Sequence, residues 1–98
     1  MNLSFAGDDP EKILTDINAA LEGRELGKMV NITLEGSDLV VIISRLGKSE
    51  IRFDGKKAGG KIEYALSKEK IAFAHRPFKD EVIAKIRKIV ESCGGTWS

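Results

Sequence analysis

Residues 28–44 read Lys28-Met-Val-Asn-Ile-Thr-Leu-Glu-Gly-Ser-Asp-Leu-Val-Val-Ile-Ile-Ser44, and this run predicts a β-hairpin. Apolar and polar residues alternate over residues 30–35, as in a strand with one buried face. Residues 35–38 have the composition of a tight turn, and an apolar strand over 39–44 returns from it. An antiparallel sheet is therefore expected at the centre of the fold.

Other segments alternate in the same way and extend this sheet. A short strand is predicted over residues 2–6, ahead of the hairpin. Further strands follow the hairpin at residues 50–54, 61–66 and 71–75, separated by a turn at 46–48, a glycine-rich loop at 55–60 and a polar turn at 67–70.

Two amphipathic helices complete the pattern. Asp9 is a suitable N-cap and Pro10 suits the first helical position, so a helix is predicted to start here and to end at Gly23 or Gly27. A second helix is predicted after Pro77, because apolar residues then recur with helical spacing up to Cys93. Gly94-Gly95 supply the residue type of a left-handed C-cap, and residues 96–98 are expected to be a short flexible tail.

The predicted order is strand, helix, four or five strands, helix. It implies one α+β domain over residues 1–98, with a mostly antiparallel sheet and both helices on one face. This order resembles the TATA-binding-protein-like and helix-grip families, in which a long C-terminal helix lies across a curved antiparallel sheet. The resemblance covers the whole chain, rests on element order alone and implies no functional residues.

Composition excludes several protein classes. The chain has 98 residues, of which 42% are hydrophobic and 32% charged, which is typical of a domain that folds alone. The single Cys93 cannot form an internal disulfide, and with one histidine it falls short of a zinc site, so no metal or cofactor is expected. No signal peptide or membrane span is recognisable, which predicts a cytoplasmic protein without a membrane partner.

Charge is distributed unevenly along the chain. Residues 1–44 hold 3 basic and 8 acidic side chains, whereas residues 45–88 hold 13 and 6. A basic run within 45–61 would bind phosphates if it gathered on one edge of the sheet, and a basic residue before the second helix lies where an anion could bind. These candidate anion-binding or nucleic-acid-binding residues are Arg45, Lys48, Arg52, Lys56, Lys57, Lys61 and Arg76.

Other features favour a solvated surface over a phosphate site. Acidic residues are interleaved with the basic run, and Phe53 and Tyr64 share the parity of core residues, which removes the stacking that single-strand binders use. Gly55–Lys61 matches G-x-x-x-x-G-K, but Ile62 replaces the required hydroxyl and a strand follows, so we expect a hairpin loop. No enzyme activity is predicted, because Cys93 falls on a buried stripe and no nucleophile–base pair can be assembled.

Two main functional hypotheses follow. The first is a protein-interaction or homodimer surface on the open face of the sheet, formed by Val40, Ile42, Ala72 and Ala74 and aided by the opposite charges of the two halves. The second is a helix-grip-type binder of a small apolar ligand, with a cavity between the sheet and the helix over 78–93. Nucleic-acid binding through residues 45–61 is a third, weaker alternative. His75 has inward parity and is expected to be a hydrogen-bonded structural residue.

Overall fold

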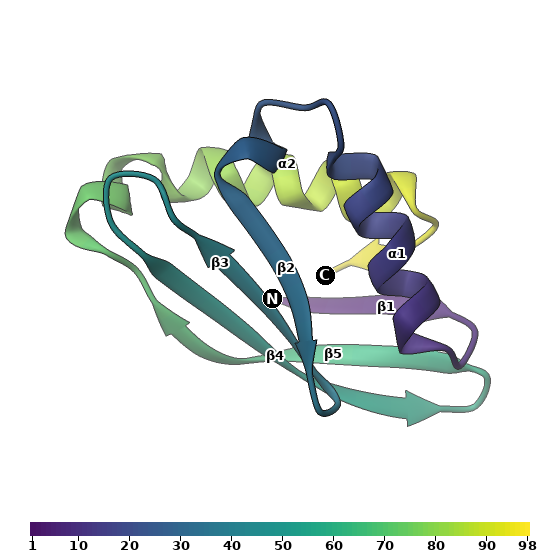
Figure 1. The fold of residues 1–98 in the computed structure, drawn as a ribbon. Coiled ribbons are helices and arrows are strands. Elements are labelled where there is room, and N and C mark those ends of the chain that lie inside the picture. Colours follow the sequence, from purple (N-terminus) through teal and green to yellow (C-terminus); the bar gives the residue numbers. More distant parts are fainter.

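The chain forms six strands, two α-helices and two short 3-10 helices in a computed structural model that describes residues 1–98 (Figure 1). The sheet has the order β2-β3-β4-β5-β1-β6, and every neighbouring pair of strands is antiparallel. The expected α+β fold with a single antiparallel sheet and two helices is confirmed. The elements are β1 (Asn2–Ala6), α1 (Pro10–Leu21), η1 (Leu26–Lys28), β2 (Val30–Glu35), β3 (Asp38–Ile43), β4 (Ser49–Ala58), β5 (Lys61–Lys70), η2 (Phe73–Phe78), α2 (Lys79–Ser92) and β6 (Thr96–Trp97).

Both α-helices pack on the same face of the sheet, as Figure 1 shows. Ile17 of α1 and Ile89 of α2 join the inward residues of the strands in one core of 18 buried side chains. Phe53 and Tyr64 belong to this core, as their parity predicted. Burial of one such side chain contributes about 1.5–3 kcal/mol, so this layer supplies most of the driving force for folding.

The predicted helix ends are confirmed. The carboxylate of Asp9 accepts hydrogen bonds from the backbone N–H groups of Glu11 and Lys12 at 3.1 and 3.3 Å, and Pro10 occupies the first turn. Gly23 follows the end of α1 with a φ of 79°. Gly94 follows α2 with a φ of 83°, a backbone conformation that favours glycine.

The β4–β5 hairpin is longer than predicted. The loop expected at 55–60 is wrong except for its tip, where Gly59 and Gly60 turn the chain with φ values of 56° and 82°. Gly55 lies within β4, at a position where a Cβ would overlap the carbonyl oxygen of Ser37 and lie 2.8 Å from the Tyr64 ring. The glycine marks a close approach of backbone to its neighbours and not a loop. The turn expected at 67–70 is also wrong, because β5 runs on through this exposed, charged stretch.

The strand predicted over 71–75 does not exist. The chain leaves the sheet after Lys70 and forms η2, so Ala72 and Ala74 do not lie on the open face of the sheet. Phe73 was expected to face the helices, but its side chain is 84% exposed. Alternating apolar residues over so short a run do not distinguish a strand from a 3-10 turn.

Residues 96–98 are paired to the sheet, which corrects the expected flexible tail. Trp97 pairs with Leu3 of β1, and Ser98 and Asn2 exchange backbone hydrogen bonds of 2.8 and 2.9 Å. The sheet therefore ends with a two-residue strand beside β1.

Candidate ligand-binding pocket

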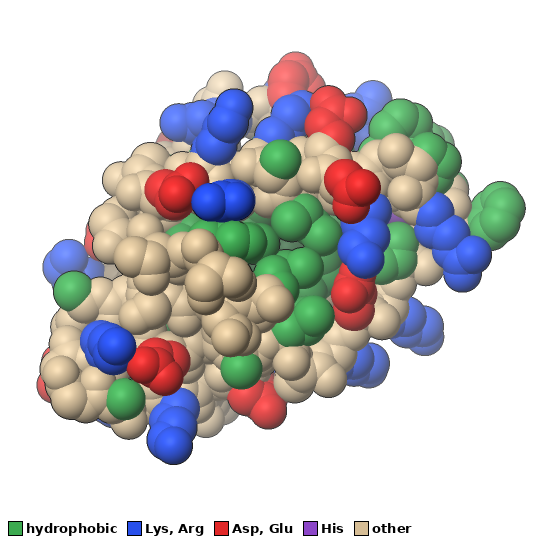
Figure 2. Space-filling model, turned by 180° about the vertical axis from the view of Figure 1, so that it is seen from behind, with side chains coloured by type: hydrophobic (Ala, Val, Ile, Leu, Met, Phe, Trp, Pro, Cys, Tyr) green, Lys and Arg blue, Asp and Glu red, His purple; other side chains and the backbone are tan.

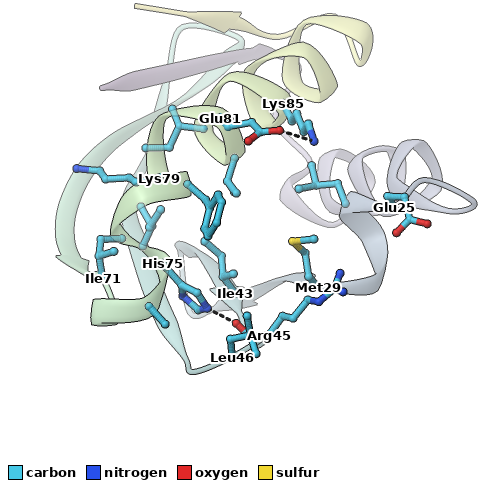
Figure 3. A pocket seen from close by; sticks show the side chains of 16 residues that line it. Glu25, Met29, Ile43, Arg45, Leu46, Ile71, His75, Lys79, Glu81 and Lys85 are labelled. Atoms are coloured by element: carbon cyan, nitrogen blue, oxygen red, sulfur yellow. Dashed lines mark hydrogen bonds and ion pairs between the residues drawn. The ribbon is translucent and has the colours of Figure 1, made fainter.

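An apolar pocket of about 320 Å³ lies between the sheet and the first half of α2 (Figure 3). Its walls come from η1, β3, β4, η2 and α2, with Ile71 before η2, so segments far apart in the sequence meet there. Ten of its 16 lining residues are hydrophobic, namely Leu26, Met29, Ile43, Leu46, Ile51, Ile71, Ala74, Phe78, Val82 and Ile83. Pockets that hold small molecules have volumes of about 300–1,000 Å³, and this pocket falls at the lower end of that range.

The pocket exists because α2 is buried unevenly along its length. In its second half, Ile86, Ile89 and Val90 are 2–4% exposed and fill the core. In its first half, Val82 and Ile83 are only half-buried and line the pocket, although they belong to the same apolar face. The sheet residues opposite, Ile43 and Ile51, are buried. The helix therefore packs closely on the sheet at one end and leaves room at the other.

A buried hydrogen-bond network holds η2 beside the β3–β4 turn. Ser49, at the start of β4, accepts the backbone N–H of Ala72 at 2.8 Å, and its Oγ lies 2.5 Å from Nδ1 of His75. Nε2 of His75 bonds to the backbone carbonyl of Arg45, as the dashed line in Figure 3 shows. Since a carbonyl only accepts, Nε2 of His75 carries a proton and donates it to this bond, while Nδ1 and the Ser49 hydroxyl share the second hydrogen bond. The prediction of a structural role for His75 is thus confirmed.

Charged side chains form the rim of the pocket. Lys79 pairs with Glu69, Lys85 pairs with Glu81 at 3.2 Å, and Glu25 pairs with Lys28 at 3.2 Å. Arg45 lines the pocket as well but forms no ion pair. In the view from behind (Figure 2), apolar side chains gather in a central hollow that charged side chains of both signs surround.

The basic residues between 45 and 61 do not gather on one edge of the sheet. Arg45 and Lys48 lie in the β3–β4 turn, beside the η2 segment that carries Arg76. Lys56, Lys57 and Lys61 lie toward the tip of the β4–β5 hairpin, which Figure 1 places at the opposite end of the molecule. Lys61 is also paired with Glu63 at 3.2 Å. The single basic run predicted from the sequence therefore divides into two groups at opposite ends of the molecule.

Arg52 belongs to an ion-pair cluster on the outer face of the sheet. Its guanidinium lies 3.0 Å from Asp38, 3.1 Å from Glu35 and 3.4 Å from Glu50. Hydrogen bonds to Asp38 and then Glu35 raise the pKa of Arg52 further above its ordinary value, so its charge is fixed. With three carboxylates around it, Arg52 is poorly placed to attract a phosphate.

The predicted interaction strip is not one surface. Val40 does point to the outer side of the sheet, opposite Thr33 and Arg52, but it is 1% exposed and presents nothing to a partner. Ile42 is half-buried between neighbouring strands. Ala72 contacts the β3–β4 turn near Gly47, and Ala74 lines the pocket, so neither joins Val40 and Ile42. The same alternation of apolar residues in the sequence therefore occurs in three different environments: the sheet, the β3–β4 turn and the pocket.

The sequence alone did not predict that residues of η1 and η2 line the pocket. Leu26 and Met29 lie outside the predicted helices and the alternating strand pattern, and only the topology brings them beside Phe78. One signal was present: the apolar stripe of the second helix starts at Phe78 and is longer than the part that the core covers. An apolar stripe that outlasts its covering predicts a cavity or an interface.

Further comparisons add no assignment. No group of three or more His, Cys, Asp or Glu side chains is placed to hold a metal ion, and none of the helices has the length and apolar character needed to cross a membrane. Searches against protein-family models, curated proteins and solved structures gave no match.

Proposed function

We propose that this protein is a non-enzymatic binder of a small apolar ligand, held in the pocket between the sheet and α2. The pocket itself carries the proposal: it combines about 320 Å³ of space with ten hydrophobic lining residues drawn from five parts of the chain.

The rim favours a ligand with one anionic group. Arg45 lies at the pocket without an ion-pair partner, whereas Lys79 and Lys85 are each paired with a glutamate. A carboxylate at the rim would gain a charge-assisted hydrogen bond from this arginine. An unbranched chain behind it would gain about 0.8 kcal/mol for each methylene buried against the apolar wall. A medium-chain carboxylate is therefore the ligand class that fits best.

Association through the open sheet face is the weaker function. That hypothesis needed a continuous apolar strip, but Val40 is buried and Ala72 and Ala74 lie outside the sheet. What remains on the outer face is half-buried Ile42 beside the Arg52 ion-pair cluster.

Ligand binding can be tested with decanoate and its neutral analogue decanol, measured by calorimetry and by thermal shift. A ligand at about 100 times its Kd stabilises the folded protein by about 2.7 kcal/mol, so both compounds should raise the melting temperature. Arg45→Ala should weaken the binding of decanoate and leave the binding of decanol unchanged, because only decanoate has a carboxylate that can pair with Arg45. The variant keeps the backbone carbonyl of Arg45 that bonds to His75.

A pocket-filling variant supplies the matched control. Ala74 lines the pocket, whereas Ala84 faces solvent on α2 and does not line it. Ala74→Trp and Ala84→Trp therefore add the same side chain inside and outside the pocket. Ala74→Trp should abolish binding of both compounds, and Ala84→Trp should leave it unchanged. The proposal is wrong if neither compound binds the wild type, or if both tryptophan variants bind equally well.

A further inference from the structure

The exposed large hydrophobic side chains of this protein all lie at one end of the molecule. They are Leu46, Phe73 and Phe78, which are 79%, 84% and 54% exposed. Leu46 belongs to the β3–β4 turn and the two phenylalanines belong to η2. Their concentration is unexpected for a surface feature without a role, because exposed apolar residues of a monomer are normally scattered.

These two segments are in direct contact. A Cβ on Gly47 would lie 3.2 Å from Ala72, and the ring of His75 bonds to the carbonyl of Arg45. Leu46 has a φ of 60°, a left-handed conformation that is costly for a branched, apolar residue. The turn thus holds a large hydrophobic side chain in water, on a strained backbone, next to η2.

The same segments are basic and contain no carboxylate. Residues 44–48 and 70–79 carry Arg45, Lys48, Lys70, Arg76 and Lys79, and of these only Lys79 forms an ion pair. Arg76 also lies over the ring of Phe73, 5.6 Å from its centroid. At the right-hand edge of Figure 2, the η2 end of the molecule, apolar side chains project beside a group of basic ones.

We propose that this end of the protein docks on the surface of an anionic phospholipid bilayer. The docking surface comprises Arg45, Leu46, Lys48, Phe73, Arg76 and Phe78. Leu46 and Phe73 enter the boundary between headgroups and acyl chains, while the unpaired cations face the phosphates. The sequence predicted no membrane partner because it has no spanning segment, but docking of this kind needs only a few apolar tips among basic residues.

A bilayer explains the composition better than a nucleic acid does. Unpaired cations suit either polyanion, and the exposed rings of Phe73 and Phe78 could both stack on bases. Leu46, the apolar residue held in water on a strained backbone, gains nothing from a nucleic acid, whereas the acyl-chain boundary of a bilayer accommodates both Leu46 and Phe78. Both residues also line the apolar pocket, which therefore opens at the docking surface. A lipid-derived ligand would reach the pocket from the bilayer without crossing water; this last step rests on the proposed function, whereas docking does not.

Docking can be measured by sedimentation with vesicles of phosphatidylcholine, with and without phosphatidylglycerol. The wild type should bind the anionic vesicles and bind pure phosphatidylcholine weakly, and added salt should release it. Phe73→Ser should weaken binding at least about tenfold through lost apolar burial, and Phe73→Leu should restore most of it. Phe73 is exposed, so the fold should tolerate both changes.

Charge reversal provides the decisive comparison. Lys48→Glu with Arg76→Glu should weaken binding about thirtyfold or more, since each cation at the surface contributes about 1 kcal/mol. Lys56→Glu with Lys57→Glu makes the same change in net charge at the far hairpin and should have a much smaller effect. Equal effects of the two pairs, absence of binding to anionic vesicles at low salt, or tight binding of a short DNA or RNA without vesicle binding would each overturn the proposal.

Docking and ligand binding fail separately in these experiments. Lys48, Phe73 and Arg76 do not line the pocket, so their variants should bind decanoate as the wild type does. Ala74→Trp, which fills the pocket, should still sediment with anionic vesicles.

Discussion

Replacing Ser49 with alanine tests whether the buried network positions η2, and with it the mouth of the pocket. The Ser49 side chain is fully buried, and its hydroxyl joins the N–H of Ala72 at 2.8 Å to Nδ1 of His75 at 2.5 Å. Ser49→Ala removes a single oxygen atom and keeps the Cβ. Its effect should therefore come from the two lost hydrogen bonds and not from a large cavity.

The expected loss of stability is about 2–3 kcal/mol. A buried polar group left without a partner costs about 1–3 kcal/mol, and this full penalty applies to His75, which is 8% exposed. Ala72 is only half-buried, so its N–H can find water and adds a smaller cost. In a domain of this size, 1 kcal/mol lowers the melting temperature by about 4–8 °C, so the variant should melt about 8–24 °C below the wild type.

Urea unfolding followed by circular dichroism measures this loss, with Ser67→Ala as the matched control. The Ser67 hydroxyl also donates a hydrogen bond, to the carbonyl of Arg52 at 3.1 Å, but it is exposed on β5. Its removal should cost less than about 1 kcal/mol, because water replaces it. Ser49→Ala should also weaken decanoate binding by loosening the wall that η2 provides. Equal losses for the two alanine variants would refute the reasoning.

Three further substitutions test other parts of the fold by urea unfolding. Gly55→Ala should cost about 3 kcal/mol, because the new Cβ would overlap the carbonyl oxygen of Ser37 and the ring of Tyr64; near-wild-type stability would contradict this close approach. Burial raises the pKa of Tyr64, whose hydroxyl has no partner, so the unfolded chain loses its phenol proton from about pH 10 while the folded protein retains it. Stability should therefore fall as pH rises above about 10, and less steeply in Tyr64→Phe; parallel pH curves for the two proteins would count against this account. Asp9→Ala should cost about 1 kcal/mol by uncapping α1, and no loss would show that the cap is redundant.

The sequence predicted those elements whose local pattern and tertiary environment agree. In the hairpin over 28–44 the residues predicted to face inward, Val30, Ile32, Leu39, Val41 and Ile43, are buried. Asp9 and Gly94 mark helix ends by local chemistry alone. The pattern failed where only tertiary contacts decide the conformation. In the sequence Gly55 resembles a loop residue. In the structure Ser37 and Tyr64 crowd it, and no local sequence signal indicates that these two residues lie beside it.

The candidate site was less accessible to prediction than the fold. A cavity beside the second helix was one of the hypotheses, because a long apolar stripe must be covered by something. Its lining could not be named, since Met29, Ile43 and Phe78 meet only after η2 has folded back. Residues 71–75 were misread because a buried histidine and an exposed phenylalanine kept the spacing of a strand in a 3-10 segment.

The strained backbone at Leu46 lowers the stability of the fold while it holds a side chain that the proposed docking uses. With a φ of 60°, this position suits glycine or asparagine, and leucine there costs the fold on the order of 1 kcal/mol. A thermostability screen should therefore select Leu46→Gly or Leu46→Asn, both of which relieve the strain. If the exposed side chain anchors the protein to a bilayer, those stabilised variants would be the ones that no longer partition to it.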